Sequence, residues 1–440
     1  AWRVASTVTN LMLVGLALLA GGFAIAAPWL VPAFTPGFDA AGIARTVELS
    51  RLMLLSPILL ALGAVATSVL NAGNRFAAAA AAPLVYNGAI IVAALALAPA
   101  IGISALAVGV VAGSLGGLLI QLPSLARLGF RYERVLVPRD PAAREALLLM
   151  APRAVGLGVS QITFIVTTTL ASGLGTGAIT AYNVAFTLLQ IPIGVIGVPL
   201  GVVVFPALSR ELARGEHGAY TALLVRSLRL ILFVMLPLTG LGIVLRGEIV
   251  TLLFGYGRFD AAAIELTAGT LLVFLLGLAG HSAIAILARA FYAAKETRIP
   301  VYAAIVSVVV NVLVAVAAVD RLGLGGLALG IALGAWVEAA VLLEALRRRT
   351  PGLSPADLGR GALASGVAAI AGSGAALAVL ALGETILGPS PGRLSLLGES
   401  LLAGGAGLLA VVVVARALRI PELPTIVGTM ADLARRRSRA

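Results

Sequence analysis

Long apolar segments follow one another along this chain, and they constrain its fold more than any other feature of the sequence. A helix needs roughly 18 apolar residues to cross a bilayer. About twelve segments reach that length, at roughly 8–34, 46–73, 81–100, 103–127, 146–173, 178–209, 219–246, 262–292, 298–319, 323–346, 360–383 and 395–416. Hydrophobic residues make up 60% of the chain and charged residues 11%, which excludes a water-soluble domain. We therefore predict an all-α polytopic membrane protein.

The composition also excludes several kinds of chemistry. The chain has no Cys and only two His, so it lacks the residues for disulfides, thiolate sites or a histidine metal site. We expect no metal, no cofactor and no catalytic residue. The net charge of +12 would suggest a nucleic-acid partner in a soluble protein. In a membrane protein, basic residues collect in the cytoplasmic loops instead, so we expect no nucleic acid.

The distribution of basic residues predicts the orientation of the chain. Both termini and the even-numbered loops carry all but six of the 31 Lys and Arg residues; the six on the other side are Arg45, Arg51, Arg246, Arg258, Arg321 and Arg393. The positive-inside rule then places both termini in the cytoplasm. This uneven distribution also supports the number of spans, because one missed helix would place every later loop on the opposite side of the membrane.

Polar side chains concentrate on the fifth and sixth predicted spans, within Ala151–Arg210. A polar group in hydrocarbon is costly unless it faces protein or a water-filled cavity, so we expect these helices to line a cavity. Asn183, Thr187 and Gln190 are spaced at i, i+4 and i+7 and share one helix face. Prolines, including Pro192, predict kinks and make the sixth span the most irregular one.

Three further polar residues of the fifth span have two interpretations. Gln161, Thr163 and Thr167 recur at roughly helical spacing. They either line the cavity or join helices to one another through hydrogen bonds.

The chain contains an internal repeat at an offset of 221 residues. Gly102, Leu106, Ala107, Gly109 and Gly113 align with Gly323, Leu327, Ala328, Gly330 and Gly334, and the segment 70–74 falls on 291–295. Six spans separate equivalent positions, so the halves are predicted to be parallel repeats, an arrangement that transporters use around a central site. The second half has six spans before two extra ones, whereas the first shows four. We therefore expect about 75 residues with two helices to be missing before residue 1.

Several motifs resemble the lipid II flippase family (MurJ, also called MviN) of the MOP exporter superfamily. They are LNAGNRF at 70–76, APRAVGLGVSQ at 151–161, LAS at 170–172, QIPIGVIGVPLGVVVFPALSR at 190–210, FGYGRF at 254–259 and RAFYAAKETRIP at 289–300. The resemblance covers essentially the whole chain. It implies two pseudo-symmetric six-helix lobes plus two C-terminal helices, fourteen helices in the family, with the first two absent here. The divisions would be an N-terminal lobe at 1–128, a cytoplasmic linker at 129–145, a second lobe at 146–350, and two helices with a basic tail at 351–440.

The resemblance also implies a function. Members of the family export lipid II, the undecaprenyl-pyrophosphate-linked peptidoglycan precursor, across the bacterial cytoplasmic membrane. The last two helices, roughly 360–416, would hold its tail. We expect a monomer whose partners are lipid II, membrane lipids and the cell-wall synthesis machinery. A cation-coupled drug exporter or an exporter of another lipid-linked oligosaccharide is the alternative, and a membrane enzyme or a purely structural lipid-binding copy is less favoured.

Basic residues near the cytoplasmic side have two interpretations in this light. Arg153 either contacts the pyrophosphate, for which its forked guanidinium is suited, or anchors the span at the interface. Arg289, Lys295 and Arg298 are a candidate cytoplasmic gate or a topology signal. Glu338 and Glu344 are predicted to pair with Arg347 or Arg348. Two positions depart from the family: many members have an acidic or amide residue at Thr167, and some have Arg at Thr187.

Overall fold

The computed structural model describes residues 2–133, 158, 161–350, 352–387, 392–425 and 428, and all regular structure among them is helical. The chain divides into two compact units, Ala1–Gly158 and Val159–Ala440. Ten described helices are long and apolar enough to cross a membrane, and a bent pair makes an eleventh span. This agrees with the predicted polytopic class. Half of the fifth predicted span falls outside the described residues, so the number twelve stays a prediction, as do the missing helices and the finer domain limits.

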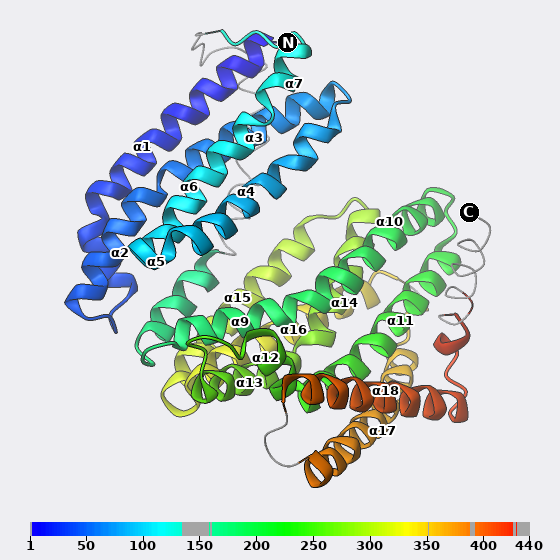
Figure 1. The fold of residues 1–440 in the computed structure, drawn as a ribbon. Coiled ribbons are helices and arrows are strands. Elements are labelled where there is room, and N and C mark those ends of the chain that lie inside the picture. The colour runs from blue at the N-terminus through cyan, green and yellow to red at the C-terminus, as the bar shows by residue number, and fades with distance from the viewer. Residues whose placement is uncertain are drawn as a thin grey trace. The chain divides into compact units, whose positions relative to one another are not determined.

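Unit 1 contains seven helices, drawn in blue to cyan in Figure 1. Their bounds are α1 Trp2–Phe34, α2 Ala40–Met53, α3 Leu55–Ala72, α4 Phe76–Ala96, α5 Ala98–Ile101, α6 Ser104–Leu119 and α7 Leu122–Arg127. The pairs α2/α3 and α6/α7 each count as one span, Ala40–Ala72 and Ser104–Arg127. Large apolar side chains point outward from this unit: Leu18 and Leu19 of α1 are each 72% exposed. Such exposure suits lipid as the surrounding solvent.

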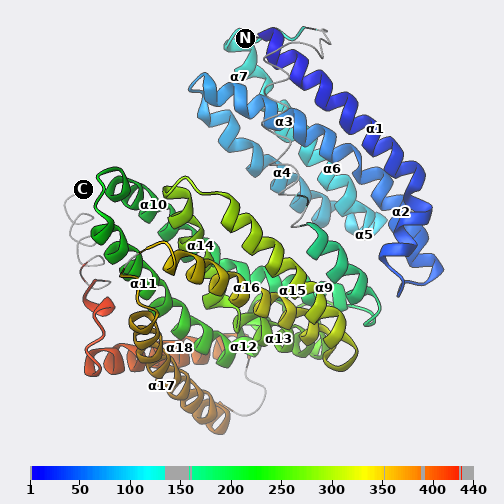
Figure 2. The same cartoon turned by 180° about the vertical axis from the view of Figure 1, so that it is seen from behind.

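Unit 2 begins with a helix at Gln161–Ser172 and continues to the end of the described chain. Its other helices are α9 Ala178–Pro192, the π-helical segment η1 Ile193–Gly197, α10 Val198–Ala213, α11 His217–Val244, α12 Arg246–Phe254, α13 Ala261–Leu275, α14 Leu278–Ala293, α15 Arg298–Leu322, α16 Leu324–Arg347, α17 Pro355–Leu387 and α18 Arg393–Ala417. Figure 2 shows this unit from behind, with α15 and α16 side by side.

The internal repeat predicted from the sequence is present in the backbone. Gly102 and Gly323, 221 residues apart, have φ values of +59° and +54°, and Asn74 and Lys295 have φ values of +55° and +58°. The turns at 74 and 295 both close with a Schellman-type hydrogen bond from the next residue. The same rare positive φ at matching positions confirms that these segments repeat in structure as well as in sequence.

The repeat extends to helix packing. A Cβ atom on Gly113 of α6 would lie 2.6 Å from the carbonyl oxygen of Tyr86 in α4, and one on Gly334 of α16 would lie 3.0 Å from the carbonyl oxygen of Ser307 in α15. Tyr86 and Ser307 are themselves 221 residues apart. In each unit the small-residue stripe therefore lets two helices approach closely, which is how membrane helices gain packing energy where no hydrophobic driving force acts between them.

Prolines account for only part of the irregularity. Pro192 directly precedes η1, so the sixth predicted span is irregular as expected. The span predicted at 262–292 is instead bent by 43° between α13 and α14, where there is no proline. Gly277 faces α16 there, and the indole Nε1 of Trp336 donates a 2.8 Å hydrogen bond to the carbonyl of Leu276. The bend is thus stabilised by a tertiary contact that no local sequence signal announces.

Candidate functional site

The predicted polar face of the sixth span lies on α9. Asn183, Thr187 and Gln190 are all exposed, and the Thr187 hydroxyl donates a 2.8 Å hydrogen bond to the Asn183 carbonyl. The opposite face, which includes Ala185 and Leu189 at 0% exposure, packs into the core of unit 2. The helix is therefore amphipathic, and its exposed side presents amides and hydroxyls instead of the apolar groups that lipid would favour.

Sequence reasoning missed one member of this face. Thr180 is exposed and lies three residues before Asn183, which places it on the same side of α9. The same helical spacing that identified the other residues would have found it. Aromatic packing holds the helix in place, since the rings of Tyr182 and Phe186 lie 5.2 and 5.6 Å from that of Phe274 in α13.

The residues predicted on the fifth span separate into two groups. Gln161 is exposed and Thr163 is partly buried, whereas Thr167 is only 3% exposed. The Thr167 hydroxyl donates to the carbonyl of Thr163 at 2.6 Å, and a side-chain hydrogen bond joins it to Tyr182 of α9. Of its two interpretations, the geometry of Thr167 favours the one in which it joins helices. Arg153 lies outside the described residues.

The three residues of the candidate gate occupy different environments. Arg289, on α14, is partly buried, donates to the carbonyl of Ala285 at 2.6 Å and lies against Gly201 of α10, where a Cβ would be 2.5 Å from its Nη1. Lys295 is exposed in the loop after α14, and Arg298 is the exposed first residue of α15. Among these three, only Arg289 packs within the helices, and it makes no ion pair in the described part of the chain.

The loop between α14 and α15 is tied to the end of α16. The Glu296 carboxylate accepts a 2.9 Å hydrogen bond from the backbone N–H of Arg298 and pairs with Arg349 at 3.2 Å. These two interactions hold the pKa of Glu296 below its usual range, the backbone hydrogen bond first. The contact was not predicted, because the two residues are far apart in the sequence.

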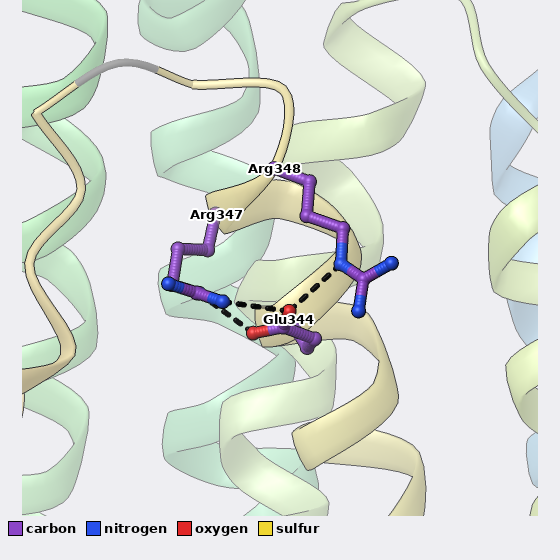
Figure 3. Close-up of polar contacts among 3 residues, drawn as sticks. All are labelled: Glu344, Arg347 and Arg348. Carbon is purple, nitrogen blue, oxygen red and sulfur yellow. Dashed lines mark hydrogen bonds and ion pairs between the residues drawn. The ribbon is translucent and has the colours of Figure 1, made fainter.

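The predicted pairing of the acidic residues on α16 is correct for one and wrong for the other. Glu344 accepts bonds from Arg347 at 2.7 and 2.8 Å and from Arg348 at 2.8 Å (Figure 3). Glu338 does not reach either arginine and is hydrogen-bonded to Ser307 of α15. One helical turn separates Glu344 from its partners, whereas Glu338 lies too far along the helix and faces its neighbour instead.

Comparison with known proteins gives a consistent result. The sequence profile of a family described as "Lipid II flippase MurJ" matches residues 1–388. A lipid II flippase MurJ of Burkholderia cenocepacia is 33% identical over 333 residues, covering 73% of this chain and 64% of the relative. A probable lipid II flippase MurJ of Rhizobium meliloti is 31% identical over 357 residues, covering 78% and 66%. The matches thus span slightly less than two thirds of these relatives.

Solved structures resemble the fold. A lipid II flippase MurJ in an inward closed conformation has a TM-score of 0.78 at 20% identity and covers 94% of this chain and 84% of that one. An inward-facing multidrug resistance MATE family transporter of the MOP superfamily has a TM-score of 0.65 at 15% identity, covering 79% and 81%. Because the family profile extends over most of the sequence, the chain belongs to the MurJ family.

Proposed function

We propose that this chain moves lipid II from the cytoplasmic to the periplasmic leaflet of the bacterial cytoplasmic membrane. The observation that carries this proposal is the match of the MurJ family over residues 1–388. The same match favours lipid II over the drug or cation substrates of the alternative, since the likeness to a MATE transporter concerns the fold alone. The chain would act as a transporter and not as an enzyme.

The polar face of α9 suits such a substrate. A pyrophosphate with a sugar-peptide head cannot cross hydrocarbon unaided, so a flippase must offer a wet interior with hydrogen-bonding groups. Asn183, Thr187 and Gln190 offer amides and a hydroxyl on one exposed face. We assign substrate contacts to these three residues and also to Gln161 and Thr163 on the preceding helix.

The phosphate groups of the substrate need cations. We assign the pyrophosphate to Arg153, because a guanidinium binds phosphate through two parallel hydrogen bonds. Arg289 is the residue of the gate set that we assign to gating, since it packs between α10 and α14 without an ion-pair partner in the described residues. Lys295 and Arg298 would assist from the loop.

The remaining features of the proposal concern organisation. The lobes would be 1–128 and 146–350, joined by the linker 129–145, with the tail of the substrate held by helices within 351–440. Both termini would lie in the cytoplasm, and the chain would work as a monomer alongside the cell-wall synthesis machinery.

The predicted orientation of the loops can be tested by cysteine labelling, because the chain has no Cys of its own. With single cysteines at 214 and 258, an impermeant maleimide should label only position 258 in intact cells.

The decisive experiment is rescue of cells depleted of their own flippase, using the complete coding sequence. Asn183→Leu removes the amide from the polar face and replaces it with an apolar group that has the same number and branching of heavy atoms. Rescue by the wild type but not by Asn183→Leu, at equal membrane abundance, supports the proposal. Asn87→Leu, the same change at an exposed amide of α4, is the matched control. Transport itself is read as the exposure of lipid II to a hydrolase added outside.

The outcomes separate the parts of the proposal. Failure of the well-inserted wild type to rescue would contradict lipid II as the substrate. Rescue by Asn183→Leu as efficient as by wild type would mean that the α9 face contacts lipid or protein instead of substrate. Arg153→Ala, tested in the same strain, should abolish rescue if Arg153 contacts the pyrophosphate.

A further inference from the structure

A cavity of about 670 Å³ lies at one end of unit 2, away from the polar face of α9. Three segments far apart in the sequence form its wall: one side of α11 over 218–230, the start of α17 with Asp357, and the segment 421–425 that follows α18. All three segments lie on the side of the membrane that carries most of the basic residues. The cavity is therefore a pocket between helices at the basic membrane interface.

Two ion pairs in or beside the pocket are already satisfied. Arg229 of α11 pairs with Glu422 at 2.7 Å, and the Glu422 side chain is only 7% exposed. Arg229 also lies across Gly361 of α17, where a Cβ would be 3.0 Å from its Nε. Asp357 is paired with Arg360. These four charges cancel. The Arg229–Glu422 pair joins the segment after α18 to α11, whereas the Asp357–Arg360 pair lies within α17.

Arg226 also lines the pocket, and neither of these ion pairs neutralises its charge. It lies one turn before Arg229 on α11, is exposed, and reaches the hydroxyl of Thr425 at 3.4 Å. It has no carboxylate partner within the described residues. Most of its donors therefore remain for a ligand, and a guanidinium's forked donors match the oxygens of a phosphate.

Other residues that line the pocket are apolar. Val225, Leu230 and Pro421 line it, and a small hydrophobic cluster that includes Phe233 and Ile420 begins immediately beyond them. A soluble anion would gain nothing from these surfaces. An amphiphile with a phosphate head and an apolar body would gain from both parts.

We propose that this pocket binds the phosphate headgroup of an anionic phospholipid of the surrounding leaflet, with Arg226 as its main contact. The glycerol and the first methylenes of the acyl chains lie against the apolar side. The bound lipid bridges α11, α17 and the segment after α18, and so fastens the last two helices to the rest of unit 2. This inference does not depend on which substrate the chain transports.

The test measures lipid binding to the full chain by native mass spectrometry, with phosphatidylglycerol and phosphatidylcholine of identical acyl chains. We expect wild type to retain phosphatidylglycerol about tenfold more tightly, and Arg226→Gln to lose that preference. Arg214→Gln removes an equally exposed charge from the loop before α11 and should keep the preference. Arg226→Lys keeps the charge but not the fork, so its preference should be intermediate.

A photoactivatable phosphatidylglycerol locates the site independently of any variant. Peptide mapping should find its crosslinks within 218–230, and glycerol 3-phosphate at millimolar concentration should not displace it. Displacement by glycerol 3-phosphate would assign the pocket to a soluble phosphate and overturn the lipid. Three results would overturn the proposal that lipid binds in this pocket. The first is an equal loss of preference in Arg214→Gln and Arg226→Gln, and the second is an unchanged preference in Arg226→Gln. The third is crosslinks found only outside 218–230.

Discussion

Replacing Gly330 by alanine tests the close packing of α15 and α16. A Cβ at this position would lie 2.6 Å from the carbonyl oxygen of Asn311 and 3.2 Å from the amide nitrogen of Ala315, both backbone atoms that cannot rotate away. Restoring ordinary contact requires the helices to separate by about 0.8 Å, which breaks the interdigitation of the neighbouring side chains. Overpacking of this kind costs about 1–3 kcal/mol.

Helix propensity opposes this cost. Alanine is favoured over glycine by about 1 kcal/mol within a helix, so the expected net loss is about 0–2 kcal/mol. Gly269→Ala in α13 is the matched control, since nothing lies within 4 Å of its added Cβ. Thermal unfolding of the purified chain in detergent should show a lower Tm for Gly330→Ala and an equal or higher Tm for Gly269→Ala. If the two variants melted together at or above wild type, the argument from close packing would be refuted.

Three further changes test single contacts. Trp336→Phe removes the hydrogen-bond donor to the Leu276 carbonyl and should lower the free energy of unfolding by about 1–3 kcal/mol. Spin labels on cysteines placed in α13 and α14 should then report a changed bend between these helices. An unchanged distance between the labels would show that Trp336 does not stabilise the bend. Thr167→Val should lower the Tm while transport is retained, because its hydroxyl joins helices; the reverse result would place Thr167 in the substrate path. Glu296→Gln should lower the Tm slightly at pH 7. Because the folded pKa of Glu296 is depressed, its contribution is present above the usual carboxyl pKa and is lost as pH falls, so the difference from wild type should vanish in acid.

The internal repeat and the contacts within one helix are features of the fold that the sequence predicted correctly. Gly102 and Gly323 align in the sequence, and both have the positive φ that favours glycine. The pairing of Glu344 with Arg347 and Arg348 was also predictable, because partners one turn apart on a helix meet wherever that helix packs.

Contacts between helices were not predictable in this way. The sequence placed Glu338 with the same arginines, whereas the structure joins it to Ser307, and it gave no sign that Trp336 would support a bend 60 residues away. The burial of Thr167 and the pocket around Arg226 likewise arise from segments distant in the chain.

The sequence by itself determined the membrane class, the positions of most spans, the repeat and the polar face of α9. Each depends on hydropathy or helical period, which act over a few turns of one segment. The tertiary structure alone decided which polar groups face each other, where a span bends and where a pocket remains. These depend on the rotation and separation of packed helices, which shape complementarity between distant segments fixes.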